Sequence, residues 1–243
     1  MAESFAWGIL AGSSLVLGGI VALAFSISRR LLGVIMAFGA GVLISAVAFE
    51  LVQEAFETSV GDGGVALGLF AGSGVFFLGD TLIDRLGGSG RKSSSGNQAA
   101  GSALAIVLGI VLDGIPESLV LGLTVLEAGA VSAAFLVAVF LSNLPESIAA
   151  TTGLAQAGWA KNRILWLWIL VMAVSGLAAL AGYGLLDTAS PRTIAFVLAF
   201  AGGAILTMLA DTMMPEAFEH GGKLVGIMTT LGFAVAFTIH TLD

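Results

Sequence analysis

The chain of 243 residues contains no cysteine. That absence excludes a disulfide framework and any metal site built from thiolates. Charge is also scarce, because charged residues make up 10% of the sequence and only nine residues are Lys or Arg. With so few cations and a formal net charge of −7, the composition argues against a nucleic-acid partner.

Hydrophobic residues, by contrast, make up 58% of the chain, and the mean hydropathy is +1.05. This composition predicts an all-α polytopic membrane protein whose first partner is the lipid bilayer. A hydrocarbon core of about 30 Å takes roughly 20 apolar residues per helix, so the length accommodates about eight spans. We therefore expect one transmembrane domain over residues 1–243. Residues 1–4 lack the basic region of a cleaved signal peptide, so we expect the first span to be retained.

Apolar stretches separated by polar or glycine-rich breaks predict eight helices. Their ranges are 5–27, 31–57, 64–84, 101–126, 130–155, 163–187, 192–219 and 223–241. Between the third and fourth predicted helices, the Gly- and Ser-rich composition around residues 87–98 is typical of a flexible connection. We expect residues 85–100 to form a flexible cytoplasmic loop.

The distribution of basic residues predicts the orientation. In an eight-helix arrangement, eight of the nine Lys and Arg residues fall on one side, and only Arg192 falls on the other. Basic residues are retained on the cytoplasmic side. The sequence thus predicts a multi-pass protein of the cell membrane with both termini extracytoplasmic.

The chain also contains an internal repeat. Residues 37–44 resemble residues 199–206, and Glu-Ala-Phe-Glu at 54–57 recurs at 216–219, with a constant offset of 162. The repeat predicts an inverted pair, helices 1–3 and 6–8, around helices 4 and 5, an arrangement typical of secondary transporters. Chance similarity between Ala- and Gly-rich membrane helices is the alternative.

Two related motifs carry the candidate chemistry. Residues 113–118 read Asp-Gly-Ile-Pro-Glu-Ser, and residues 142–147 read Ser-Asn-Leu-Pro-Glu-Ser. The spacing puts Asp113 and Glu117 on one helix face, and Ser142, Asn143 and Glu146 on one face of the next helix. Each proline removes a backbone hydrogen bond, so we expect kinked helices with carbonyl oxygens released toward a cavity.

Both glutamates are predicted to lie near the bilayer centre, where a charged side chain costs at least about 3 kcal/mol. Residues 93–160 contain no Lys, Arg or His. We therefore expect these acids to lack a protein cation and to be neutralised by protons, by a metal ion, or by both in alternation. The alternative is that protonated carboxyl groups only link helices by hydrogen bonds.

These motifs, the eight helices and the variable loop between the third and fourth helices resemble the ZIP (Zrt/Irt-like) family of metal transporters, over nearly the whole chain. The resemblance implies that Asp113, Glu117, Ser142, Asn143 and Glu146 line a metal site. It also implies an elevator-like movement of helices 1, 4, 5 and 6 against helices 2, 3, 7 and 8.

The chain departs from the family pattern at several ligands. Asp113 and Gly114 stand where the family usually has His-Asn, and Ser142 stands where it has His or Gln. The sixth predicted helix lacks the acidic ligand of some members, and Ser175 is its nearest small polar residue. All recognisable ligands are oxygen donors, which suit Mn²⁺ or Mg²⁺ and argue against strict zinc selectivity.

Further acids mark the predicted helix ends. Glu50 and Glu54 are candidates for a cation access path at the outer end of the second helix, and a solvated helix end is the alternative. Asp211, Glu216 and His220 are candidates for an exit path or a weaker metal site, although His220 also fits an exposed loop histidine. His240 is expected to take no part.

The predicted function is uptake of a divalent metal ion, namely zinc, manganese, iron or cadmium, by alternating access, with no prosthetic group. The alternative is a proton- or cation-conducting channel that uses the same carboxylates. An enzyme is not expected, because the His-Glu-x-x-His motif of metalloproteases is absent. Small-residue steps at 8–12 and 68–72 permit close helix contacts within or between subunits, so a homodimer is possible.

Overall fold

The computed structural model describes residues 1–59, 63–96, 101–128 and 131–242. Regular secondary structure in these ranges is entirely helical. Seven helices are long and apolar enough to cross a membrane, and an eighth apolar helix is shorter, with 17 residues. The described part of the chain therefore has only helices as regular structure, with the lengths expected of a polytopic membrane protein.

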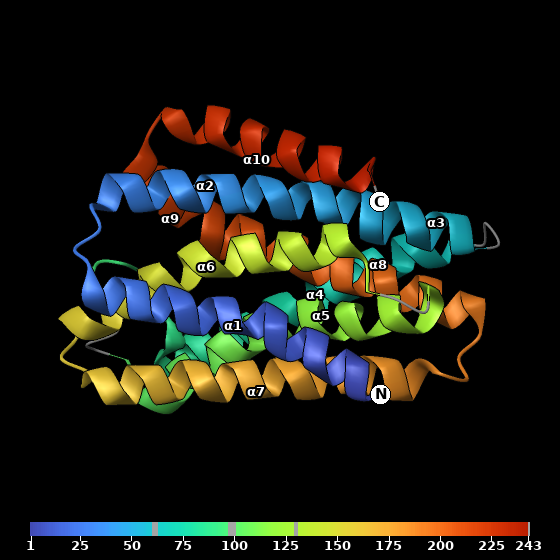
Figure 1. Ribbon diagram of the computed structural model, residues 1–243, viewed down its shortest axis with the longest axis horizontal. Coiled ribbons are helices and arrows are strands. Elements are labelled where there is room, and N and C mark those ends of the chain that lie inside the picture. The colour runs from blue at the N-terminus through green and yellow to red at the C-terminus, as the bar shows by residue number, and fades with distance from the viewer. Residues whose placement is uncertain (60–62, 97–100, 129–130, 243) are drawn as a thin grey trace.

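Eight main helices follow one another along the chain (Figure 1). They are α1 (Ala2–Ala24), α2 (Arg29–Ala46), α4 (Gly64–Ile83), α5 (Ala103–Ala128), α6 (Ala133–Gln156), α7 (Lys161–Leu186), α8 (Pro191–Met208) and α10 (Leu224–His240). Two short helices, α3 (Glu54–Thr58) and α9 (Met214–Gly221), extend α2 and α8. Each of the eight predicted apolar segments overlaps one main helix, so the predicted helix order is confirmed.

Two of the long spans pass through π-helical turns, which are wider than α-helical ones. The turn η1 (Val47–Gln53) joins α2 to α3, and η4 (Leu209–Met213) joins α8 to α9. Their first residues stand 162 positions apart, which is the offset of the sequence repeat. Figure 1 shows that α2 and α8 run in opposite directions. A third π-helical turn, η2 (Asp84–Gly88), ends α4.

The helices pack in two groups. In the first, α1 packs on α6 and α7, and α5 packs on α7. In the second, α10 packs along α2, and α4 packs along α8. The groups meet where α2 contacts α6 and where α5 contacts α8, around a shared apolar core that includes Leu121, Phe135 and Leu198. The candidate motifs on α5 and α6 therefore face the junction between the groups.

The small-residue steps make contacts inside this chain. A Cβ atom on Gly8 of α1 would lie 2.7 Å from the Cβ atom of Ala179 in α7. A Cβ atom on Gly68 of α4 would lie 2.8 Å from that of Ala199 in α8. Close approach of these helix pairs thus accounts for both steps, and the homodimer stays a prediction without support from them.

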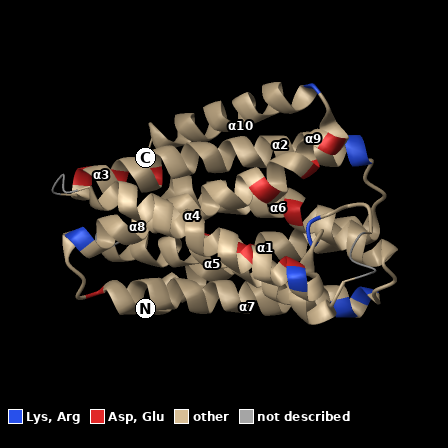
Figure 2. Cartoon of the chain, turned by 180° about the vertical axis from the view of Figure 1, so that it is seen from behind, with Lys and Arg blue, Asp and Glu red and all other residues tan. Residues whose placement is uncertain are grey.

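Charge is distributed unequally along the bundle. Figure 2 shows that most Lys and Arg residues gather at the end that carries the loop between α4 and α5. Arg192 belongs to the first turn of α8, which begins at the other end (Figure 1). Both chain termini lie toward the end that carries Arg192 (Figure 1). The side of the membrane that each end faces stays a prediction.

Candidate functional site

The two Pro-Glu-Ser motifs lie inside α5 and α6, and both helices continue through their prolines, Pro116 and Pro145. The three carboxylate residues of the motifs are buried, with exposed fractions of 2% for Asp113, 2% for Glu117 and 6% for Glu146. Their side chains are therefore directed into the bundle and not toward lipid. Their role as ligands of a metal ion stays a prediction.

The polar neighbours of these acids are buried as well. Ser142 and Asn143 have exposed fractions of 0% and 7%, and the Ser142 hydroxyl donates a hydrogen bond to the carbonyl of Val139 at 3.0 Å. Helix α2 packs closely here, because a Cβ atom on Gly39 would lie 3.2 Å from the Cα atom of Ser142. Among the described interactions, none joins Ser142 or Asn143 to the three carboxylates. Their role as ligands stays a prediction.

The loop between α4 and α5 places two cations among the acids. The Lys92 Nζ atom lies 3.3 Å from Asp113 Oδ2 and 3.1 Å from Glu146 Oε1. Arg91 donates to both carboxylate oxygens of Asp113, from Nε at 2.9 Å and from Nη2 at 2.8 Å. The expectation that the acids lack a protein cation is therefore wrong, because residues just before the cation-free stretch fold back onto them.

Local backbone geometry explains how this loop enters the bundle. Gly90 has a φ angle of +69°, which favours glycine, and its carbonyl accepts a hydrogen bond from the Ser93 amide at 2.9 Å. The side chain of Arg91 fills space left by Gly109 of α5, where a Cβ atom would lie 2.3 Å from Arg91 Cδ. The amide and hydroxyl of Ser94 then donate to Glu216 Oε1 at 2.8 and 2.7 Å.

Residues 91–94 are consequently buried, although their composition predicts a flexible linker. The flexibility itself stays a prediction, and residues 97–100 of the predicted loop lie outside the described residues. Sequence reasoning missed the contribution of Arg91, Lys92 and Ser94 to the site. The sequence offers one signal for this contribution: two adjacent cations, Arg91 and Lys92, directly precede a segment that contains acids but no Lys, Arg or His.

Neighbouring carboxylates favour the charged form of both loop cations. Burial by itself lowers the pKa of the Lys92 ammonium, but Asp113 and Glu146 outweigh burial and hold this pKa above its ordinary value. Burial likewise opposes the charge of Arg91, while Asp113 and Asp80 raise its pKa. The loop therefore contributes two positive charges to the buried cluster.

These charges do not balance the acids. Glu117 interacts electrostatically with Glu146, Lys92 and Asp113, yet no Lys, Arg or His within the described ranges forms an ion pair with it. Arg91 is shared among Asp113 of α5, Asp80 of α4 and Asp84 of η2. Five carboxylates, those of Asp80, Asp84, Asp113, Glu117 and Glu146, thus face two cations, which leaves a formal excess of three negative charges when all are ionised.

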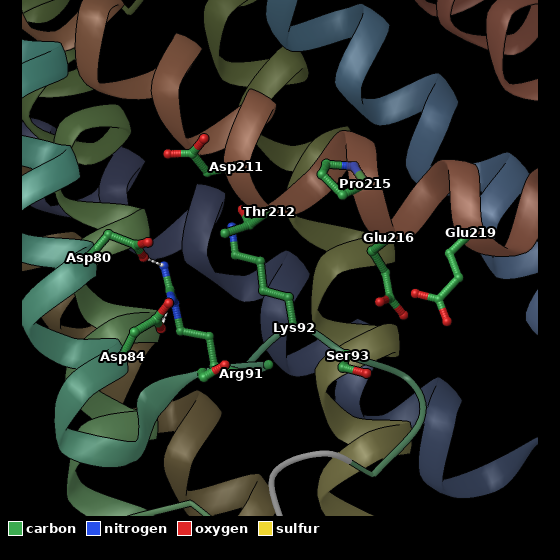
Figure 3. Close-up of a pocket in the computed structure, with 12 residues that line it drawn as sticks. Asp80, Asp84, Arg91, Lys92, Ser93, Asp211, Thr212, Pro215, Glu216 and Glu219 are labelled. Carbon is green, nitrogen blue, oxygen red and sulfur yellow. Dashed lines mark hydrogen bonds and ion pairs between the residues drawn. The ribbon is translucent and has the colours of Figure 1, made fainter.

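A cavity of about 250 Å³ separates the loop from α4, η4 and α9 (Figure 3). Its acidic lining residues are Asp80, Asp84, Asp211, Glu216 and Glu219. Figure 3 shows Arg91 and Lys92 extending from the loop beside it. The structure thus brings two of the predicted exit residues, Asp211 and Glu216, to one cavity together with the loop cations.

The third predicted exit residue is adjacent. His220 Nε2 lies 3.1 Å from Glu216 Oε1, and the side chain of His220 has an exposed fraction of only 8%, so it is not an exposed loop histidine. Ligand atoms of Glu216, Glu219 and His220 lie within 4.8 Å of one another. Carboxylate and imidazole groups at that separation are able to share one metal ion.

The two predicted access residues differ in surroundings. Glu54 is exposed, as a solvated helix end requires. Glu50 is partly buried, accepts a hydrogen bond at 2.8 Å from Ser132, the N-cap residue of α6, and contacts His240 Nδ1. The expectation that His240 takes no part did not foresee this contact. A role of Glu50 in cation access stays a prediction.

In comparisons with known proteins, no family model matches the chain, and no curated protein matches it.

Proposed function

We propose that the protein carries a divalent transition-metal ion across a membrane through the carboxylate cluster of α5 and α6. One observation supports this most strongly: the Lys92 ammonium lies buried between Asp113 and Glu146, within ion-pair distance of both. A buried carboxylate cluster that surrounds an ammonium group also attracts a metal cation. The proposed ligands are Asp113, Glu117, Ser142, Asn143 and Glu146.

The charge and chemistry of the cluster favour a divalent ion. Its carboxylates outnumber its cations, and Glu117 has no cation of its own among the described residues. Every proposed ligand atom is oxygen, which suits Mn²⁺ better than it suits a strictly selected Zn²⁺. We therefore place manganese first among zinc, manganese, iron and cadmium.

The proposed mechanism is alternating access of the kind that the resemblance to ZIP transporters implies. The group α1, α5, α6 and α7 would move against the group α2, α4, α8 and α10. Opposite directions of α2 and α8, and π-helical turns at the repeat offset, support an inverted repeat. With the basic end in the cytoplasm, a negative-inside potential would favour uptake.

Uptake of Mn²⁺, Zn²⁺, Fe²⁺ and Cd²⁺ into proteoliposomes tests this proposal. Glu117→Gln and Glu146→Gln each remove a charged ligand at nearly constant volume, so we expect uptake to fall about tenfold or more. Glu3→Gln, at the exposed start of α1, is the matched control and should transport like the wild type. Equal uptake by the two site variants and the wild type would refute the site.

Electrical recording separates a carrier from the channel alternative. A carrier gives saturable flux without resolvable single-channel currents, since each ion requires a conformational cycle. Single-channel currents that disappear in Glu146→Gln would assign the same carboxylates to a channel.

A further inference from the structure

The Lys92 ammonium stands where an ion bound by Asp113 and Glu146 would stand. Its side chain has an exposed fraction of 3% and reaches carboxylates on two different helices. Both contacts are ion pairs, and Nζ makes no well-directed hydrogen bond to any described residue. An ammonium group carries three donors. Lys92 is therefore held between two carboxylates, as a metal ion would be.

The rest of the loop holds Lys92 in this place. Arg91 pairs with Asp80 of α4 and with Asp113 of α5, and so links one helix of each group. Ser94 is bonded to Glu216 of α9 through both its amide and its hydroxyl. Anchors on both sides of Lys92 keep the ammonium at high local concentration beside the carboxylates.

We propose that Lys92 is a tethered competitor for the transported metal: it fills the carboxylate site when no metal is bound, and an incoming divalent ion must displace it. This inference rests on the proposed function. Two cations that share the oxygens of Asp113 and Glu146 repel each other strongly at such short separation, so joint occupancy is disfavoured. Lys92 thus lowers the affinity of the site and reduces the uncompensated negative charge of the empty site.

Metal affinity in the purified protein provides the first test. We expect Lys92→Gln to bind Mn²⁺ about ten- to hundredfold more tightly than the wild type, because close charge pairs couple with energies of that order. Lys161→Gln, at the exposed start of α7, removes an equal charge and should leave the affinity unchanged. Gly109→Ala should displace Arg91, loosen the loop and also tighten binding, without altering any carboxylate.

Loop displacement provides the second test and leaves Lys92 intact. The chain has no cysteine, so Ser93→Cys introduces a single thiol at a position whose exposed fraction is 7%. We expect its reaction with a water-soluble maleimide to accelerate about tenfold or more when Mn²⁺ saturates the protein. Ser89→Cys, which is exposed in the same loop, should react rapidly with and without Mn²⁺.

The outcomes separate the inference from the proposed function. If Mn²⁺ binds but Lys92→Gln binds it equally or more weakly, Lys92 is a structural residue and the inference fails alone. The same holds if Ser93→Cys stays unreactive while Mn²⁺ is bound. If neither the wild type nor Lys92→Gln binds any of the four metals, both the inference and the proposed function fail.

Discussion

Replacing Lys92 by Ala should destabilise the metal-free protein substantially. The Glu146 carboxylate is buried, and Lys92 is its ion-pair partner in the described part of the chain. Breaking a buried pair from one side leaves an uncompensated charge and costs about 3–5 kcal/mol. We expect the lower part of that range, because Asp113 keeps the bidentate contact with Arg91.

The assay is the free energy of unfolding in mixed micelles, from denaturant titration with a chelator present. The chelator matters because a bound metal would replace the missing cation and stabilise the variant by mass action. Lys92→Met combined with Glu146→Gln removes both charges at similar volume, and it should unfold within about 1 kcal/mol of the wild type. A loss below about 1 kcal/mol for Lys92→Ala alone would refute the electrostatic reasoning.

Two further predictions concern packing and capping. Gly72→Ala should cost about 1–3 kcal/mol of unfolding free energy, because its Cβ atom would lie 1.8 Å from the Phe200 carbonyl oxygen. Gly74→Ala meets open space and should be neutral or stabilising by up to about 1 kcal/mol, so equal stabilities of the two variants would contradict the α4–α8 contact. Ser132→Ala removes both the cap of α6 and the hydrogen bond to Glu50, and should cost about 1–2 kcal/mol in the same titration. Wild-type stability of this variant would show that neither bond contributes.

The helices and the buried acids could be predicted from local sequence patterns. Apolar runs set the helix limits closely; for example, the predicted segment 163–187 corresponds to α7 at Lys161–Leu186. The i, i+4 spacing of Asp113 and Glu117 is a property of one helix, so it survives any error in helix packing. Burial of both motifs was expected, because a charged side chain that faces lipid is energetically unfavourable.

The ion pairs could not be predicted, because they depend on tertiary contacts of residues far apart in sequence. The Gly- and Ser-rich composition around Arg91 indicates only that the backbone is flexible. The positions of the Arg91 and Lys92 side chains depend on the space at Gly109 and on acids from three helices. His240 and Glu50 stand 190 positions apart, and no local pattern connects them. These ion pairs therefore depend on contacts between distant residues, which the periodicity of the sequence does not predict.

The wide turns η1 and η4 have a mechanical consequence. A π-helical turn accommodates one residue more than an α-helical turn, and each residue of an α-helix rotates the chain by about 100° about the axis. If the extra residue of η1 moved into α3, the helix would stay intact, and the wide turn, or bulge, would shift along it. The side chains between the old and new positions of the bulge would then rotate by about 100° about the helix axis. Glu50 lies inside η1 and Asp211 lies inside η4, so a migrating bulge would reorient one acid in each of the two long spans.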